Sequence, residues 1–296
     1  MFCRTMGLGV LLLAGACITK PKFETLDTDP SGSAVGHADE MALIPATTLA
    51  GSTLKPTGTG KGPGPGKDKN KGKCQGEGCD DDDDENGGSS GGGGAPPPVD
   101  DGMAPSEPVI VPAFRIDVRE ASVREYAACV TAGACGMAGD GAGCTVPAGL
   151  GEHPVTCVNR AQAAAYCAWR QKRLVRYDEW SAAAAGSALR PFPWGAELPS
   201  PERVNACGPE CKAPGMYATP DGFVMTAPSG SFPAGRSPEG VFDLAGNVAE
   251  WVDDESVVRG GSYADGEPAS VGAFTVRSVA PETSEPSIGF RCARDP

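Results

Sequence analysis

The chain has 296 residues and a formal net charge of −13 at neutral pH. This acidic balance excludes a nucleic-acid-binding protein of the usual kind, because such a protein needs a basic face for the phosphate backbone. The length allows one large domain or two small ones, and the distribution of apolar residues favours one.

Residues 1–17 have the features of an export signal. Arg4 precedes an apolar run from Met6 to Ala16, and Cys17 follows three small residues. The run is too short to span a bilayer comfortably. The pattern resembles a bacterial lipoprotein signal, in which Cys17 is lipidated and becomes the mature N-terminus. An ordinary secretory peptide cleaved near Ala16 is the alternative. We therefore expect an exported protein, anchored by lipid in the periplasm or on the cell surface.

Residues 18–102 are predicted to form a disordered tether. They include Gly/Pro/Lys-rich sequence at 57–73, a block of acids at 80–85 and Gly/Ser/Pro-rich sequence at 87–98. Such segments have too few apolar groups to offset the entropy of an ordered chain. A solvated spacer is the simplest interpretation, with a calcium-buffering or partner-binding acidic tail as the alternative.

Residues 103–296 are predicted to form a single domain with three helices. Ser122 and Glu125 form a capping box that opens a helix at Val123 to Val130. Asn159 and Gln162 open a second helix in the same way. A third helix is expected from Tyr177 to Ala185, with Gly186 as a left-handed cap. The remainder is rich in Gly and Pro, with short strands such as Phe114 to Val118. We expect a mixed α/β domain with much irregular structure.

The cysteines indicate disulfides. The chain has 12 cysteines, and an even number remain after the two in the signal are set aside. Export to an oxidising compartment favours bridges. Zinc is the alternative, but the spacing Cys207-x-x-x-Cys211 fits a zinc site only loosely. Histidines are also scarce: His153 is the only one in the domain, and we expect it to pack or to form hydrogen bonds.

The most informative stretch is G-V-F-D-L-A-G-N-V-A-E-W, from Gly240 to Trp251. Its glycines, Asn and acids suit a tightly folded loop that turns carbonyl oxygens inward. Asp243 and Glu250 add carboxylate oxygens, and calcium prefers oxygen ligands of these two kinds.

Several motifs occur together in a fixed order. They are H-P-V-T-C-V-N-R-A-Q-A-A-A-Y-C-A-W, K-R-L-V-R-Y-D-E-W, P-F-P-W-G, S-G-S-F-P-A-G, D-L-A-G-N-V-A-E-W, R-G-G-S-Y and G-F-R-C. Together they resemble the formylglycine-generating enzyme family, also called sulfatase-modifying factor domains, from about Phe114 to the C-terminus. The resemblance implies a variant of the C-type lectin fold.

The resemblance also implies a copper site that this chain lacks. Family members oxidise a cysteine of sulfatase precursors to formylglycine, using Cu(I) held by two thiolates and molecular oxygen. The matching positions here are Asp265 and Ser270. Soft Cu(I) prefers sulfur, so copper is not expected. Glu267 and Asp265 could form an acidic pair for acid/base work or a hard metal, and a solvated loop is the plainer alternative.

Two structural calcium sites are implied by the same resemblance. Turns in which Asp and Asn satisfy local amides are the alternative at each site. The first site maps onto Asn205, Ala206, Asp221 and Phe223, and the second onto Asp243, Gly246, Val248 and Glu250.

The family joins the cysteine of A-Y-C to that of G-F-R-C, which implies a Cys167–Cys292 bridge. Cys207 and Cys211 are expected to close a local loop. Two bridges would then join the remaining four cysteines, with three pairings open: Cys129, Cys135, Cys144 and Cys157.

These expectations lead to three candidate functions. The first is a non-catalytic, calcium-stabilised binding or scaffold module that recognises an exported protein or peptide, with membrane contact only through a lipid anchor. The second is a copper-independent enzyme that modifies an exported protein. The third, a formylglycine-generating oxidase, requires a different alignment of residues 264–270. Fold alone does not choose among them.

Overall fold

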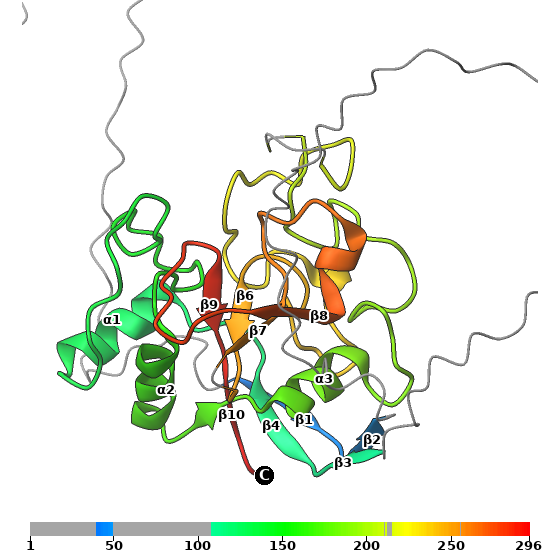
Figure 1. Ribbon diagram of the computed structural model, residues 1–296, viewed down its shortest axis with the longest axis horizontal. Helices are drawn as coiled ribbons and strands as arrows, with labels where there is room; N and C mark the ends of the chain where they lie inside the picture. The colour runs from blue at the N-terminus through cyan, green and yellow to red at the C-terminus, as the bar shows by residue number, and fades with distance from the viewer. Residues whose placement is uncertain (1–39, 50–107, 210, 212–214, 255) are drawn as a thin grey trace, which may run out of the picture. The chain divides into compact units, whose positions relative to one another are not determined.

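The computed structural model describes residues 40–49, 108–209, 211, 215–254 and 256–296. Its first sheet has four antiparallel strands in the order β1-β4-β10-β5. The sheet brings together segments from opposite ends of the chain (Figure 1). Its strands are β1 (Met41–Ile44), β4 (Phe114–Asp117), β10 (Cys292–Arg294) and β5 (Arg173–Leu174).

The prediction that residues 18–102 are disordered is wrong for Met41 to Leu49. β1 pairs with β4 along its whole length, and β2 (Thr47–Leu49) pairs with β3 (Val109–Val111). Ile44 and Leu49 are buried in the core. β1 and β2 are too short to show an alternating apolar pattern. They also directly precede low-complexity sequence, so they were assigned to the same disordered segment. The domain therefore uses residues upstream of the predicted boundary at 103.

The three helices lie where the sequence placed them. α1 (Val123–Thr131) and α2 (Arg160–Trp169) each begin with the expected capping box, from Ser122 and Asn159. α3 (Tyr177–Ala185) ends at Gly186, which has a φ of 59°. Its ψ of −174° is outside the left-handed helical region, so the predicted type of cap was wrong although the end point was right.

The second sheet positions the functional region. Its order is β8-β7-β6-β9, with β6 and β9 parallel and the other pairs antiparallel. A bulge between Arg259 and Gly260 interrupts the pairing of β7 with β8. The strands are β6 (Ala249–Trp251), β7 (Val257–Gly260), β8 (Gly272–Ser278) and β9 (Ile288–Phe290), and two 3₁₀ turns, η3 (Pro233–Gly235) and η4 (Pro268–Ser270), lie in the loops.

Two large apolar clusters fill the interior. One surrounds Trp180 and Phe114 and joins α3 to the first sheet. The other surrounds Tyr126, Tyr166 and Phe290, where α1 and α2 meet the second sheet. Phe290 packs edge to face against both tyrosines, with the Tyr166 and Phe290 centroids 5.3 Å apart, while Tyr126 and Tyr166 are stacked. The first cluster includes Val241 and Leu244 of the loop between η3 and β6, and Asp243 and Asn247 of that loop are buried.

The predicted signal at 1–17, with Cys17, and most of the predicted tether lie outside the described residues. Within the part of the chain that the structure describes, no helix has the length and apolar character needed to cross a membrane.

Candidate functional site

A buried ion pair joins Glu250, near the end of the Gly240–Trp251 segment, to Arg291. Arg291 and Glu250 are 0% and 1% exposed at their side chains, and their closest N–O distance is 2.6 Å. Trp180 donates its indole N–H to Glu250 Oε2 at 2.9 Å. Burial alone would lower the pKa of Arg291, but the Glu250 carboxylate more than reverses this and raises it. Arg291 therefore stays charged, with Glu250 as its ion-pair partner.

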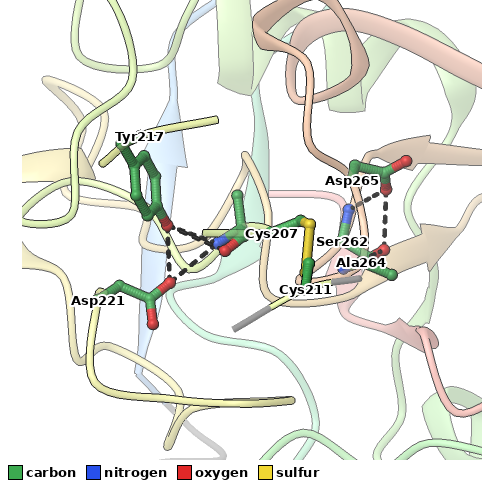
Figure 2. The surroundings of a disulfide bond; sticks show 8 residues. Cys207, Cys211, Tyr217, Asp221, Ser262, Ala264 and Asp265 are labelled. Atoms are coloured by element: carbon green, nitrogen blue, oxygen red, sulfur yellow. Dashed lines mark hydrogen bonds between the residues drawn. A yellow bond between two sulfur atoms is a disulfide. The ribbon is translucent and has the colours of Figure 1, made fainter. Parts of the chain in front are cut away.

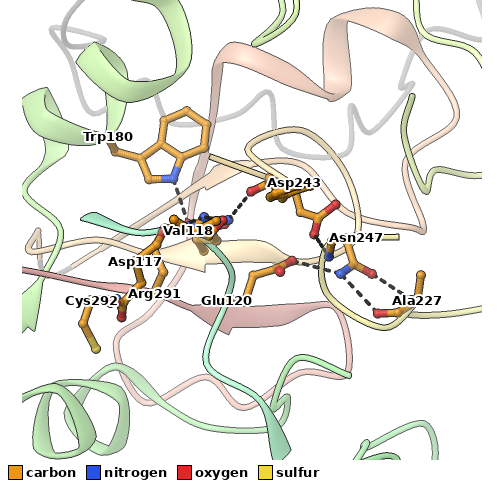
Figure 3. A network of polar contacts seen from close by, with 12 residues as sticks. Asp117, Val118, Glu120, Trp180, Ala227, Asp243, Asn247, Arg291 and Cys292 are labelled. Carbon is orange, nitrogen blue, oxygen red and sulfur yellow. Dashed lines mark hydrogen bonds and ion pairs between the residues drawn. The ribbon is translucent and has the colours of Figure 1, made fainter. Parts of the chain in front are cut away.

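The Arg291 guanidinium also bonds two backbone segments, one at the end of β4 and one in the loop before β6. Its Nη2 donates to Phe242 O at 2.8 Å, and its Nη1 donates to Asp117 O at 3.2 Å. Figure 3 shows the guanidinium between the end of β4 and the loop that carries Asp243. The motif G-F-R-C was recognised in the sequence, but this role of its arginine was not. Arg291 is a structural centre of the loop.

Asp243 and Asn247 both have a φ of 56°, a left-handed conformation that Asp and Asn tolerate better than most residues. Gly230 N–H donates to Asp243 Oδ2 at 2.6 Å, and Asn247 Nδ2 donates to Glu120 Oε1 at 2.9 Å. The other Glu120 oxygen, Oε2, is buried and has no hydrogen-bond partner. Burial, followed by repulsion from Asp243, raises the pKa of Glu120 well above its usual value.

Glu120 belongs to none of the recognised motifs, so the sequence did not predict its place in this cluster. Phe242 N–H donates a hydrogen bond to Val118 O at 2.9 Å, and this contact brings Glu120 beside the Gly240–Trp251 loop. The cluster then holds three carboxylates, from Glu120, Asp243 and Glu250, but only one guanidinium. Burial also raises the pKa of Asp243. A buried excess of negative charge costs free energy unless a proton or a cation compensates it.

The residues of the second predicted calcium site partly fit a calcium ion. Asp243 and the unpartnered Glu120 oxygen are hard donors, and Gly246 and Val248 lie in the same loop. The carboxylate of Glu250, in contrast, is engaged by Arg291 and Trp180. Among the described residues, no three or more His, Cys, Asp or Glu side chains are grouped to hold a metal. An ion here would need backbone carbonyls, which calcium accepts.

The first predicted calcium site is already filled by hydrogen bonds. Tyr217 Oη lies 2.7 Å from Asp221 Oδ2, to which it donates, and 3.0 Å from Ala206 O. Asp221 Oδ2 also accepts from Ala206 N–H, and Asp221 Oδ1 accepts from Phe223 N–H. Of the side-chain oxygens predicted to bind this calcium ion, only Asn205 Oδ1 is buried without a hydrogen-bond partner. Two of the predicted donors thus bind a tyrosine hydroxyl, and an ion could enter only if Tyr217 moved.

The two predicted sites are linked. Asn205 Nδ2 donates to Asn247 Oδ1 at 3.0 Å, and Asn247 N–H donates to Asn205 O at 2.8 Å. His153 is close by and bonds Thr226 Oγ1 through Nδ1 at 3.0 Å. This agrees with the hydrogen-bonding role expected for His153.

Asp265 and Ser270, the positions that the family resemblance aligns with the copper thiolates, lie in one turn. The Asp265 carboxylate accepts from both the N–H and the Oγ of Ser262, each at 2.8 Å. Ser270 is half-buried at the end of η4, and its N–H donates to Glu267 O. The Glu267 side chain is exposed. Asp265 therefore binds its own loop, and no contact joins its carboxylate to Glu267 in an acid/base pair.

Four disulfides join cysteines of the described residues. Cys167–Cys292 and Cys207–Cys211 are confirmed, and the open question is resolved as Cys129–Cys135 and Cys144–Cys157. Cys207 lies against the turn at 265–270, because its N–H donates to Asp265 O at 3.0 Å. Figure 2 shows the Cys207–Cys211 bridge between Asp265 and the Tyr217–Asp221 pair.

A polar cavity of about 220 Å³ lies beside Glu120. The two arginines that line it form ion pairs: Arg119 with Glu40 at 2.6 Å, and Arg124 with Glu152. Ser229 Oγ is buried there without a partner. Glu120 lines this cavity, although it is buried.

Comparisons with known proteins agree with this geometry. The model of the "Sulfatase-modifying factor enzyme 1-like domain" matches residues 82–296. The inactive C-alpha-formylglycine-generating enzyme 2 of Bos taurus is 37% identical over 155 residues, which are 48% of this chain and 50% of that protein. The formylglycine-generating enzyme of Streptomyces coelicolor is 34% identical over 173 residues, covering 50% of this chain and 54% of that protein.

The chain thus spans about half the length of these curated relatives. Among solved structures, PvdO from Pseudomonas aeruginosa covers 86% of this chain and 94% of its own, with a TM-score of 0.56 and 20% identity. That likeness shows the fold, with its few helices and much irregular structure. The chain belongs to the sulfatase-modifying factor family, the family of the formylglycine-generating enzymes.

Proposed function

We propose that this domain is a non-catalytic member of its family, which binds or holds an exported protein or peptide. The observation that carries the proposal is the turn at Asp265 to Ser270. It offers a carboxylate and a hydroxyl where relatives have two thiolates. The similarity to proteins named inactive formylglycine-generating enzyme 2 supports it.

The chemistry of the donor set argues against copper. Cu(I) binds soft thiolate ligands far better than carboxylate or hydroxyl oxygen. The Asp265 carboxylate is also held by two Ser262 donors, which would have to be released before it could bind anything else. The residues present do not fit Cu(I), and no oxidation through it follows.

A peptide oxidation assay tests this directly. The purified protein is incubated with a C-x-P-x-R peptide, Cu(I) and oxygen, and the aldehyde is sought by mass spectrometry. We expect no aldehyde and no tight Cu(I) binding. The double variant Asp265→Cys with Ser270→Cys should gain Cu(I) affinity, whereas the matched Asp265→Ala with Ser270→Ala variant should not. Aldehyde formed by the unmodified protein would overturn the proposal.

We also propose that the second predicted site binds calcium. Asp243, Glu120 and the carbonyls of Gly246 and Val248 are the groups that would hold it, and the ion would neutralise the buried negative charge. The unpartnered Glu120 oxygen supports this assignment. Bound calcium would be structural, and it would fix the loop above Arg291.

Calcium removal gives a sharp readout. At calcium concentrations 100 times the dissociation constant, binding adds about 2.7 kcal/mol to stability, so EGTA should lower the melting temperature. Asp243→Asn should abolish this difference, and Asp221→Asn should leave most of it. An EGTA-insensitive melt would contradict the calcium assignment without touching the argument about copper.

A copper-independent enzyme remains the second candidate. It would rely on Asp265, Glu267 or Ser270, but the first of these is bound within its turn and the second is exposed. A triple Asp265→Asn, Glu267→Gln, Ser270→Ala variant that lost a measured modification of an exported protein would establish it.

We also propose export and anchoring through Cys17. The apolar run before Cys17 and the long polar segment after it support this. Detergent-dependent extraction from membranes, lost in Cys17→Ala, would test it.

A further inference from the structure

The first sheet turns one face towards the core and leaves part of its other face open. On β4 and β10, Ile116 and Ala293 stand opposite one another and are buried in the core. One residue along each strand, Leu43, Arg115 and Arg294 stand side by side across β1, β4 and β10 (Figure 1). Successive side chains of a strand point to opposite faces, so these three residues, here called the open row, lie on the face away from the core. Leu43 is 52% exposed, Arg294 is exposed and Arg115 is half-buried.

The two arginines of the open row have no anionic partner among the described residues, where neither forms an ion pair or a side-chain hydrogen bond. Like charges directly opposite each other in a sheet are destabilising. The described acids within or next to these three strands are paired with other bases: Glu40 with Arg119, Asp117 with Lys172, and Asp295 with Arg173. Arg115 and Arg294 are therefore left as local positive charges, beside an exposed leucine.

The chain from the predicted anchor enters the domain at this sheet. The β1–β4 and β2–β3 ladders share one register, in which Ile44 faces Phe114 and Leu49 faces Val109. Residues 50–108 thus leave and rejoin the domain at neighbouring positions and add nothing to the distance from Cys17. Only residues 18–40 separate Cys17 from β1. A chain of that length spans at most about 80 Å when fully extended.

We propose that the open row docks on an anionic lipid surface, with the two guanidinium groups on lipid phosphates and Leu43 in the headgroup layer. Arginine matches phosphate oxygens in a bidentate geometry, and buried apolar area adds to the attraction of basic groups for anionic lipid. The net charge of −13 opposes this only weakly, because exposed charges more than about 8 Å away are largely screened at physiological salt.

This inference rests on the proposed anchoring through Cys17, which would keep the open row near a bilayer. The affinity of the open row for lipid is a property of the domain itself, so it can be measured without the anchor. The two proposals can therefore fail separately.

The test uses the mature chain, residues 18–296, which keeps every described residue and lacks the apolar run and Cys17. Sedimentation with vesicles of phosphatidylglycerol and phosphatidylcholine in equal parts is compared with sedimentation with phosphatidylcholine alone. EGTA is present, so that calcium cannot bridge acids to lipid. We expect binding to the anionic vesicles only, and weaker binding as salt is raised.

The double variant Arg115→Ser with Arg294→Ser should bind the anionic vesicles about 25-fold more weakly, since each arginine near the surface contributes about fivefold. The matched control is Arg236→Ser with Arg277→Ser, which removes two exposed arginines from outside this sheet. Its affinity should change by less than about twofold. Equal binding to both kinds of vesicle, or equal losses in the two double variants, would overturn the proposal.

A tryptophan probe tests the position of Leu43. In Leu43→Trp, the added indole should enter the headgroup layer, so its emission should move to shorter wavelength with anionic vesicles. Leu198→Trp is the control, because Leu198 is 69% exposed and lies outside the sheets. A shift of the same size at both positions would count against docking through the open row.

Other occupants of the open row are distinguished without vesicles. Removing both arginines should leave the melting temperature unchanged or raise it slightly, because a like-charge contact is lost. A lower melting temperature would show that they bind acids of the chain itself, such as residues 80–85. A dimer that is lost in the variant would show a second copy on this face. Either result would overturn lipid docking, whereas detergent-independent extraction of the unmodified protein would refute only the anchor.

Discussion

The buried network around Arg291 and the turn at Asp265 to Ser270 differ in what they preserve. In the first, Glu250 and Arg291 are almost fully enclosed, and the guanidinium bonds two segments of backbone. In the second, Asp265 bonds only Ser262 of its own turn through its carboxylate, and Glu267 is exposed. The side chains of the first region join distant segments of the fold, whereas the Asp265 carboxylate bonds only within its own turn.

The difference follows from burial. A charge removed from water must keep its partner, because the loss of either member leaves an uncompensated ion in a dry environment. A residue on a half-exposed turn has water as an alternative partner, so its replacement costs little. The fold can therefore keep its buried pairs while side chains on such a turn are exchanged.

Arg291→Met should have the largest effect. It leaves Glu250 buried and unpaired and releases Phe242 O and Asp117 O, so we expect a loss of about 3–5 kcal/mol in the free energy of unfolding. Denaturant melts of the purified domain would measure it.

The matched control is Arg277→Met. Arg277 pairs with Glu285 at 3.0 Å, but both side chains are more than 40% exposed. Exposed pairs contribute about 0–1 kcal/mol. If the two variants lost similar amounts, the contrast between the buried network and the surface would be wrong.

Asp117 gives the next largest effect, through pH. Burial raises the pKa of Asp117 to about 6 from 3.8, although Lys172 opposes the shift from 2.6 Å away. The folded protein then holds this proton more strongly than the unfolded chain. Stability from this group is present below about pH 4 and is lost as pH rises towards 6, by roughly 2–3 kcal/mol.

The comparison is between the pH slopes of the unmodified protein and Asp117→Asn, measured by denaturant melts between pH 4 and 7. Asn cannot titrate, so the variant should lack this part of the fall. Its overall stability should also be lower, because Lys172 remains buried without its anion. Parallel slopes would show that Asp117 titrates normally.

The sequence predicted features that depend on local spacing. The capping boxes at Ser122 and Asn159 fixed the starts of α1 and α2, since the residues that bond are three apart. The family motifs implied the Cys167–Cys292 bridge. What the sequence did not predict depends on distant contacts. Glu120 meets Asn247, 127 residues later, only because the chain before β6 pairs with the residue after β4.

The first calcium site illustrates the same limit. Its four positions match the motif, yet Tyr217, outside that motif, fills the space between Ala206 and Asp221. Spacing identifies groups that could bind an ion, but it does not reveal a neighbouring hydroxyl that already binds them.

Tyr217→Phe should have the smallest effect and sharpen this point. The variant loses a hydrogen bond to a carboxylate on a half-buried side chain, which we expect to cost about 1–2 kcal/mol in EGTA. In calcium the loss should be smaller, because the freed oxygens of Asp221 and Ala206, together with Asn205 Oδ1, can then accept an ion. Calcium titration should accordingly show one more bound ion in Tyr217→Phe than in the unmodified protein. Equal stoichiometry, with calcium stabilisation lost in Asp221→Asn, would instead mean that calcium and the tyrosine share the site.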